Sequence, residues 1–297
     1  MRRILVTGAG GFVAGPLLER LKGRARIFRL ARTSAPGSIA CDLSDPASAR
    51  AAVSRARPDL VYHLAGVTRA PDWNGLWRAN VTTTTNLLEA LASAGRPARV
   101  LIAASSGEYG AAGGARKARE DSPLEPVTLY GSCKLSQTMA ALSFNRGPLE
   151  VVVARIFNVI GPGTPENQAP GAFASQIARV AAGLQSSEIA VGDLSPRRDY
   201  IDVRDVAAAL ETIARRGRAG ECYNVGSGRS MPMSAILRGL AKAAGVRVTE
   251  RIDPARFRRS EVQDIAADTR RIRALGWKPR ITLERSLADT LAWWSAR

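Results

Sequence analysis

A glycine-rich turn near the N-terminus constrains this chain more than any other feature. The β-branched run at 3–7 ends in Thr-Gly-Ala-Gly-Gly-Phe-Val-Ala, and a helical stretch over 12–22 follows. A strand, a glycine turn and a helix N-terminus together form a cradle for a dinucleotide pyrophosphate. Gly8 would permit the tight turn, Gly11 would admit the phosphates, and Ala14 would allow close helix–strand packing. The predicted cofactor contacts here are Thr7, Gly8, Gly10, Gly11, Phe12 and Val13.

The end of the second predicted strand indicates which dinucleotide binds. An acid there would bond the ribose 2′-hydroxyl of NAD, whereas an arginine suits the 2′-phosphate of NADP. Residues 28–33 read Phe-Arg-Leu-Ala-Arg-Thr and contain no acid. Arg32 could grip a phosphate with two hydrogen bonds. We therefore predict NADP as the cofactor, with NAD as the alternative.

Apolar strands alternate with helices through the first half of the chain. Strands are predicted at 3–7, 25–30, 38–41, 60–62, 100–103 and 151–155, and helices at 12–22, 46–56, 78–94 and 129–145. This alternation indicates a parallel sheet covered on both faces. Further helices are predicted at 171–183, 203–215, 231–243 and 282–295. We expect an α/β fold: a Rossmann-type doubly wound sheet over 1–160, rejoined by 198–226, with a smaller substrate-binding lobe from 161–197 and 227–297.

The formal net charge of +17 raises the question of a nucleic-acid partner. Only five of the 43 basic residues are lysines, and the arginines are scattered through every segment. A scattered excess is a weaker signal than a basic stripe with aromatics. We expect no nucleic-acid partner, and a positive field that helps to gather small anionic ligands.

Cysteine, histidine and hydropathy patterns exclude other classes. The three cysteines are isolated and His63 is the only histidine, so we expect no metal site. Its position after a buried strand favours packing over proton transfer. The chain has no apolar stretch of membrane-spanning length and no signal-peptide pattern at its start. We expect a cytoplasmic protein without a membrane partner.

A tyrosine and a lysine form the candidate catalytic pair. Tyr130 and Lys134 are four residues apart at the start of a predicted helix, so they share one face. A free phenol has a pKa of about 10, and a nearby ammonium would lower it. Ser105 and Ser106 follow a buried strand, where a hydroxyl would face the ligand crevice of a parallel sheet. These residues suit acid–base chemistry on a carbonyl.

In this order along the chain, the motifs resemble those of extended short-chain dehydrogenases/reductases that act on nucleotide sugars. The resemblance also rests on Asp42-Leu43, His63-Leu64-Ala65-Gly66, Asn80-Val81, Tyr109-Gly110, Pro126, Arg155-Ile156-Phe157-Asn158 and Gly161-Pro162-Gly163. The C-terminal half is similar to GDP-4-keto-6-deoxy-mannose reductases at 191–194, 197–205, 223–228, 253–262 and 276–279.

The resemblance implies a role for each matching residue. Ser105, four residues before Tyr109, would be the catalytic hydroxyl beside Tyr130 and Lys134. Further cofactor contacts are implied at Asp42, Leu43, Leu64, Ala65 and Gly66, and Tyr130 and Lys134 would also contact the cofactor, Lys134 through the nicotinamide ribose. Substrate contacts are implied at Ser106, Glu108, Asn158, Arg198 and Arg258. Position 259 is Arg where these reductases usually have Pro, so Arg258 and Arg259 are alternatives for gripping the diphosphate.

The same family hosts reductases, epimerases and 4,6-dehydratases. Dehydratases carry an acid two residues before the tyrosine that Tyr109 matches, and here that residue is Gly107. Epimerases commonly keep the acid after the second strand, which this chain lacks. The resemblance therefore implies NADPH-dependent reduction of the C4 keto group of a GDP-linked 4-keto-6-deoxyhexose.

Two alternatives to that reaction remain open. One is a 4-epimerase or a reductase of UDP- or dTDP-sugars. The other is a non-catalytic NADP-binding regulator, against which the intact Ser105, Tyr130 and Lys134 set argues. Relatives of this fold often dimerise through the helices at 78–94 and 129–145, so a homodimer is expected.

Overall fold

A seven-stranded parallel sheet carries the N-terminal part of the chain, which confirms the predicted fold class. The computed structural model describes residues 2–32, 37–110, 117–257 and 260–297. The sheet order is β10-β6-β5-β4-β1-β2-β3, and every pairing is parallel. Its strands are β1 (Arg3–Thr7), β2 (Arg26–Ala31), β3 (Ser38–Ala40), β4 (Leu60–His63), β5 (Ala98–Ser105), β6 (Leu149–Ile156) and β10 (Cys222–Val225).

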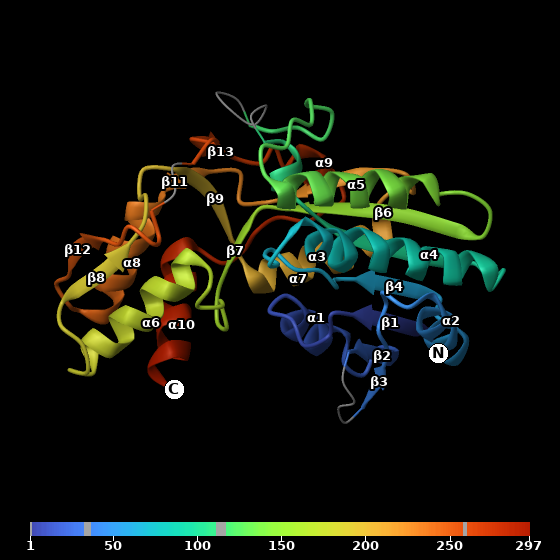
Figure 1. Cartoon of the computed structure of the whole chain (residues 1–297), viewed down its shortest axis with the longest axis horizontal. Helices are drawn as coiled ribbons and strands as arrows, with labels where there is room; N and C mark the ends of the chain where they lie inside the picture. The colour runs from blue at the N-terminus through green and yellow to red at the C-terminus, as the bar shows by residue number, and fades with distance from the viewer. Residues whose placement is uncertain (1, 33–36, 111–116, 258–259) are drawn as a thin grey trace.

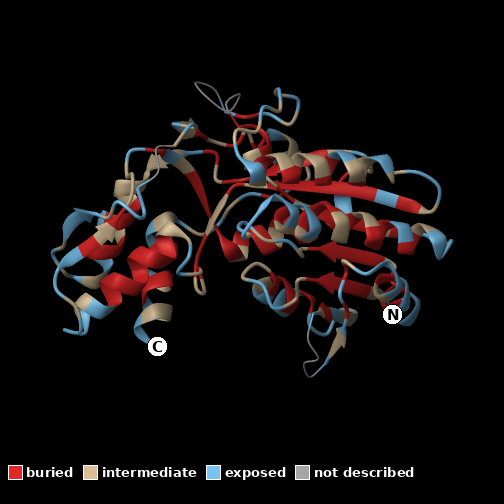
Figure 2. Ribbon diagram, viewed as in Figure 1, coloured by how far each residue is buried: buried red, intermediate tan, exposed pale blue. Residues whose placement is uncertain are grey.

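Helices cover both faces of this sheet, as Figure 1 shows. One face packs against α1 (Ala14–Leu21) and α7 (Val203–Arg216), and the other against α2 (Pro46–Ala56), α4 (Thr83–Ser93) and α5 (Leu129–Ser143). Successive strand side chains alternate between the two cores: Ile4 and Val6 join the first, and Leu5 joins the second. Figure 2 shows that β1, β4, β5, β6 and β10 are mostly buried, which explains their continuous apolar sequence, whereas β2 and β3 at the edge of the sheet are largely intermediate or exposed.

The smaller part of the molecule is built from segments after residue 157. It contains the strands β7 (Asn158–Ile160), β8 (Glu188–Val191), β9 (Arg197–Asp202), β11 (Ser230–Pro232), β12 (Thr249–Ile252) and β13 (Asp264–Ile265). Three helices, α6 (Ala169–Ala181), α8 (Met233–Ala244) and α10 (Leu283–Ser295), share a third core. Between β9 and β11 the chain returns to the large sheet through α7 and β10, and α9 (Arg270–Ala274) also packs there. Among the described residues, no helix has the length and apolarity needed to cross a bilayer.

The helix predicted at 78–94 starts earlier and is interrupted. The structure has α3 (Trp73–Trp77), a π-helical turn at Arg78–Thr82, and then α4. The Asn80 side chain donates to the Leu76 carbonyl at 2.9 Å and so takes the acceptor that the Asn80 backbone would use in an α-helix. Inserted π turns of this kind are frequent at functional sites. Here Asn80 of the turn lines the cleft described next.

Candidate functional site

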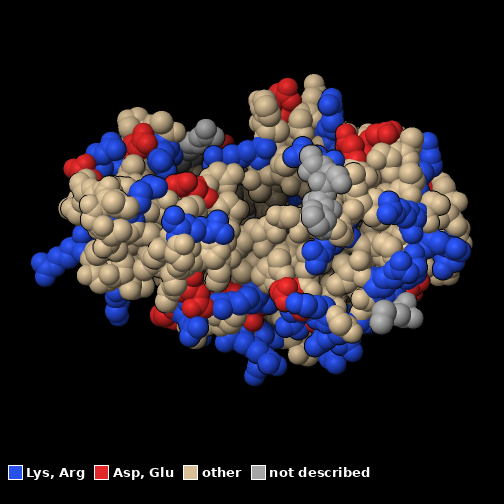
Figure 3. Space-filling view, turned by 90° about the horizontal axis from the view of Figure 1, so that it is seen from below, with Lys and Arg blue, Asp and Glu red and all other residues tan. Residues whose placement is uncertain are grey.

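A cleft of about 720 Å³ lies at the carboxyl ends of the central strands. β1 lies between β2 and β4, so the strand order reverses there, and ligands of such sheets bind outside this point. In Figure 3 the surface is hollowed between the two parts of the molecule, and basic side chains spread over the face with acidic ones among them. Both parts line the cleft, since Tyr200 and Met233 come from the smaller one.

The glycine turn forms one wall of the cleft. Gly8 has a φ of +64°, and a Cβ built there would lie 2.8 Å from the Ala65 backbone nitrogen. Gly11 donates its N–H to the Gly8 carbonyl at 2.9 Å, which closes the turn. α1 begins after Val13 with no side-chain cap and no acid in its first turn. No side chain therefore occupies this helix start, which leaves it open to an anion in the cleft, although the Ala14 N–H already donates to the Gly11 carbonyl at 3.1 Å and Pro16 has no N–H.

The other predicted cofactor contacts fall into three groups. Phe12, Val13, Leu64, Ala65 and Gly66 line the cleft together with Gly8 and Gly11. Gly10, Arg32 and Asp42 are exposed and lie outside its lining. Thr7 and Leu43 are buried. The Thr7 hydroxyl accepts from the Ala65 N–H at 3.1 Å, so it shapes the cleft wall from behind and does not face a ligand.

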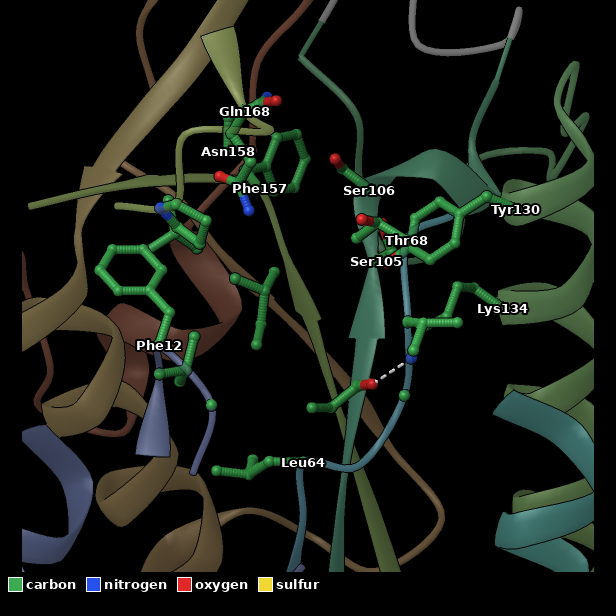
Figure 4. Close-up of a pocket in the computed structure, with 18 of the residues that line it drawn as sticks. Phe12, Leu64, Thr68, Ser105, Ser106, Tyr130, Lys134, Phe157, Asn158 and Gln168 are labelled. Atoms are coloured by element: carbon green, nitrogen blue, oxygen red, sulfur yellow. Dashed lines mark hydrogen bonds between the residues drawn. The ribbon is translucent and has the colours of Figure 1, made fainter. Parts of the chain in front are cut away.

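Ser105, Tyr130 and Lys134 meet on the opposite wall, as Figure 4 shows. Ser105 ends β5, and its hydroxyl accepts from the Gly107 N–H at 3.1 Å. Tyr130 lies in the first turn of α5. Thr128 is the N-cap of this helix, and its hydroxyl accepts from the Gly131 N–H at 3.0 Å. Lys134 follows one turn later on the same helix face. The structure therefore brings all three predicted catalytic side chains together.

The pKa of Tyr130 on this wall differs from the prediction. Burial raises the pKa of Tyr130, with Ser105 acting in the opposite direction. The expected lowering of the Tyr130 pKa by Lys134 is wrong, because the Lys134 amine donates instead to the Ala103 carbonyl at 2.6 Å and to Gln137. Burial lowers the pKa of Lys134 to about 8, against the raising effect of Glu108. At neutral pH the site therefore holds a protonated phenol beside an ammonium.

A second cavity of about 400 Å³ opens on the other side of Ser105 and Tyr130. It shares Ser106 and Asn158 with the main cleft, and Arg198 lines its far side. The Arg198 guanidinium donates to the Ser260 hydroxyl at 2.7 Å, and burial lowers its pKa. Three of the predicted substrate contacts thus surround one space. Arg258, and the alternative Arg259, lie outside the described residues.

Glu108 does not lie where the resemblance placed it. Its side chain is fully buried and faces away from both cavities. The carboxylate accepts from Arg155 Nε at 2.9 Å, from the Thr138 hydroxyl at 2.9 Å and from the Ser105 N–H at 3.2 Å. Because its oxygens are already occupied inside the protein, Glu108 is removed from the set of substrate contacts. It instead fixes the backbone at Ser105.

Other cleft residues were missed at the sequence level. Thr68, Phe157 and Gln168 point into the cleft in Figure 4. Phe157 adjoins Asn158 in a motif already singled out, which was an available signal. Thr68 and Gln168 belong to the loops near 67–76 and 164–175, which the sequence predicts to build the substrate pocket together with 111–120; which of their side chains face the cleft follows only from the fold.

Comparison with known proteins agrees with this geometry. Residues 4–226 match the family described as the NAD dependent epimerase/dehydratase family. GDP-6-deoxy-D-mannose reductase from Pseudomonas aeruginosa is 34% identical over 100% of this chain and 98% of its own length. A dTDP-6-deoxy-L-talose 4-dehydrogenase (NAD(P)(+)) from Kitasatospora kifunensis is 32% identical, over 99% of this chain and 95% of its own length. The structure of RMD from Pseudomonas aeruginosa complexed with NADPH superposes with a TM-score of 0.89 and 32% identity, covering 100% of this chain and 99% of that one.

Proposed function

The chain belongs to the NAD dependent epimerase/dehydratase family, and we propose that it reduces the C4 keto group of a GDP-linked 4-keto-6-deoxyhexose with NADPH. The observation that carries this proposal is the meeting of Ser105, Tyr130 and Lys134 on the wall facing the glycine turn. The similar reductase and the similar structure complexed with NADPH support the substrate class and the cofactor.

The residues of the cleft fit a dinucleotide. The uncapped start of α1 and the close approach of Gly8 to Ala65 leave a polar, narrow cradle that suits a pyrophosphate. Gly8, Gly11, Phe12 and Val13 would hold it, and Leu64, Ala65 and Gly66 would form the floor beneath it. Lys134 would donate to the nicotinamide ribose. NADPH supplies the hydride when bound.

The protein's own part in the reaction is proton transfer and orientation. Tyr130 would give its hydroxyl proton to the oxygen that becomes the C4 alcohol. Burial raises the pKa of Tyr130, so the phenol keeps that proton until the oxygen gains negative charge. Ser105 would donate a hydrogen bond to the same oxygen and orient the carbonyl. Asn158 and Arg198 would hold the substrate, with Arg198 pairing with its diphosphate.

Reduction fits the cleft better than 4,6-dehydration does. Dehydration needs a carboxyl group to remove a proton and expel water, whereas reduction needs one proton donor. Among the described residues, no aspartate or glutamate lines the main cleft, and the acid that lines the second cavity, Glu261, lies on the Arg198 and Ser260 side of it. Gly107 lies against Tyr130, and Glu108 is buried outside the cleft lining, where it accepts hydrogen bonds from Arg155 and Thr138. The similar dTDP-6-deoxy-L-talose 4-dehydrogenase leaves reduction of a dTDP-sugar as the second candidate.

A direct assay separates these candidates. The purified protein is mixed with NADPH and either GDP-4-keto-6-deoxymannose or the corresponding dTDP-4-keto-6-deoxy sugar. We expect nicotinamide absorbance to fall with the GDP substrate and a GDP-6-deoxyhexose to form. Faster loss with the dTDP-sugar would reassign the nucleotide. Stable absorbance with both, despite tight NADPH binding, would favour a non-catalytic binding protein.

Arg32 is proposed to select NADPH over NADH. Replacing Arg32 with Ala is expected to weaken NADPH binding about 10-fold or more, because a charge-assisted pair with the 2′-phosphate is lost. NADH binding should barely change. Titration of nicotinamide fluorescence with both cofactors measures this, and Arg50→Ala, on the exposed side of α2, controls for loss of one positive charge. Equal weakening of NADPH and NADH binding would contradict the role.

We also propose a homodimer that works in the cytoplasm. α5 carries two large exposed apolar side chains, Leu129 at 58% and Met139 at 61% exposed, on one of the helices expected to form the interface. The three cysteines are free and buried, which suits a reducing compartment. Light scattering of the purified protein would test the dimer, and a monomer at micromolar concentration would argue against it.

A further inference from the structure

A row of buried polar side chains runs behind the cleft and ends at Lys134. Thr7, His63, Thr84 and Gln137 come from β1, β4, α4 and α5, and each is 0% exposed. None of the four is among the residues that line the cleft. Buried polar groups of this kind must be satisfied by each other, so their hydrogen bonds can be followed one by one.

Thr84 sets the direction of every bond in the row. Its hydroxyl donates to the Asn80 carbonyl at 2.6 Å, so its oxygen can only accept from the others. It accepts from Gln137 Nε2 at 2.7 Å and lies 2.8 Å from His63 Nε2, which must therefore carry the ring proton. His63 Nδ1 then accepts from the Thr7 hydroxyl at 2.8 Å. The π turn before α4 places Asn80 and Thr84 at this point.

The acceptor role of the Thr84 oxygen also fixes the orientation of the Gln137 amide. Because its nitrogen faces Thr84, its oxygen faces Lys134 and accepts one N–H of the amine. The Ala103 carbonyl accepts a second at 2.6 Å. An ammonium has three N–H bonds, so one remains for the cleft, whereas a neutral amine has two and would have none left.

We propose that Gln137 is a positioning residue for Lys134, locked by Thr84 and His63, and that it preserves an ammonium with one N–H free for the cleft. This inference rests on the proposed function in one respect only: the acceptor of the free N–H would be the nicotinamide ribose of the cofactor. The arrangement itself consists of hydrogen bonds between the protein's own groups.

The charges around the amine agree with this role. Titratable groups near it are Glu108 from the turn after β5, His63 from β4, and Tyr130 and Cys133 from its own helix. Burial, and then the charge of Lys134, lower the pKa of His63 to about 3, so the ring stays neutral. Lys134 has a pKa of about 8. Small changes in its acceptors therefore decide its charge near neutral pH.

The test follows the titration of Lys134 directly. The chain has only five lysines, so ¹³C labelling at lysine Cε gives few signals, and Lys134→Arg identifies the one sought. Gln137→Leu removes an acceptor and should lower the Lys134 midpoint by about one pH unit or more. Gln137→Glu adds a carboxylate and should raise it by a similar amount. Thr84→Val removes the acceptor that holds the Gln137 amide, so the amide can turn, and this variant should lower the Lys134 midpoint by less than Gln137→Leu does.

The control is Gln176→Leu. Gln176 is also a buried helical glutamine, but its amide bonds only to backbone at Ala172 and Ala190. This variant should lose stability without moving the Lys134 midpoint. An unchanged midpoint in both Gln137 variants, or shifts of the same sign, would overturn the proposal whether or not the protein proves to be a reductase.

If the reductase activity is found, its pH profile gives a second readout. Lys134 is charged below its pKa, so in Gln137→Leu the high-pH limb of kcat should move to lower pH by the NMR shift. Activity lost at pH 8 should return on acidification. A uniform loss at every pH would show that Gln137 has only a structural role.

Discussion

Replacing Tyr130 with Phe is expected to lower kcat by about 10²–10⁴-fold, the usual contribution of a positioned proton donor. The ring would keep its packing beside Ser105 while losing the only proton that the phenol can give. NADPH binding should stay nearly intact, because the proposed cofactor cradle is built from the glycine turn and Leu64–Gly66. Single-turnover kinetics and fluorescence titration of NADPH measure the two effects separately.

Tyr223→Phe provides the matched control for this variant. The Tyr223 hydroxyl accepts from the Arg218 N–H at 2.8 Å, outside the residues that line the cleft. Its loss should lower the melting temperature and leave kcat within about twofold, since one neutral hydrogen bond contributes roughly 0.5–1.5 kcal/mol to stability. Near-normal turnover by Tyr130→Phe would refute the assignment of the proton donor.

Arg155→Met is expected to lower the free energy of unfolding by about 3–5 kcal/mol, because it leaves a buried carboxylate without its partner. Arg155 and Glu108 form an ion pair at 2.9 Å, and their side chains are 4% and 0% exposed. Arg155 also donates to the Glu120 carbonyl at 3.1 Å. Urea denaturation followed by circular dichroism measures the change.

An exposed ion pair between Arg119 and Asp121 provides the comparison for Arg155→Met. Arg119 binds Asp121 through two hydrogen bonds of 3.0 Å, yet both side chains are more than half exposed. Arg119→Met should therefore cost no more than about 1 kcal/mol. If the two variants lost similar stability, the buried pair would not hold the segment behind Ser105 as described.

The local motifs of this chain could be predicted from sequence because each is encoded over a few residues. The glycine turn joins β1 to α1 directly, and Tyr130 and Lys134 share one helix face. The parallel sheet followed from apolar strands separated by helices. The interrupted helix at Trp73–Ser93 was not predicted, because the Asn80 side chain competes for a carbonyl that propensity assigns to the backbone.

The direction of individual side chains was harder to predict. Glu108 sits inside a motif of the cleft, and only the packing of Arg155 and Thr138 behind it turns the carboxylate inward. The pKa of Tyr130 likewise depends on tertiary packing. The four-residue spacing suggested that Lys134 lowers its pKa, whereas burial raises it in the folded protein.

The sequence by itself determined the sheet, the cofactor turn and the three side chains that meet on the catalytic wall, since short spacings and strand order fix these. Only the tertiary structure decided what lies behind them. Gln137 meets Thr84 across 53 residues, and Thr7 meets His63 across 56. Hydrogen bonds between such distant segments depend on how strands and helices pack, and that packing sets which proton each buried group holds.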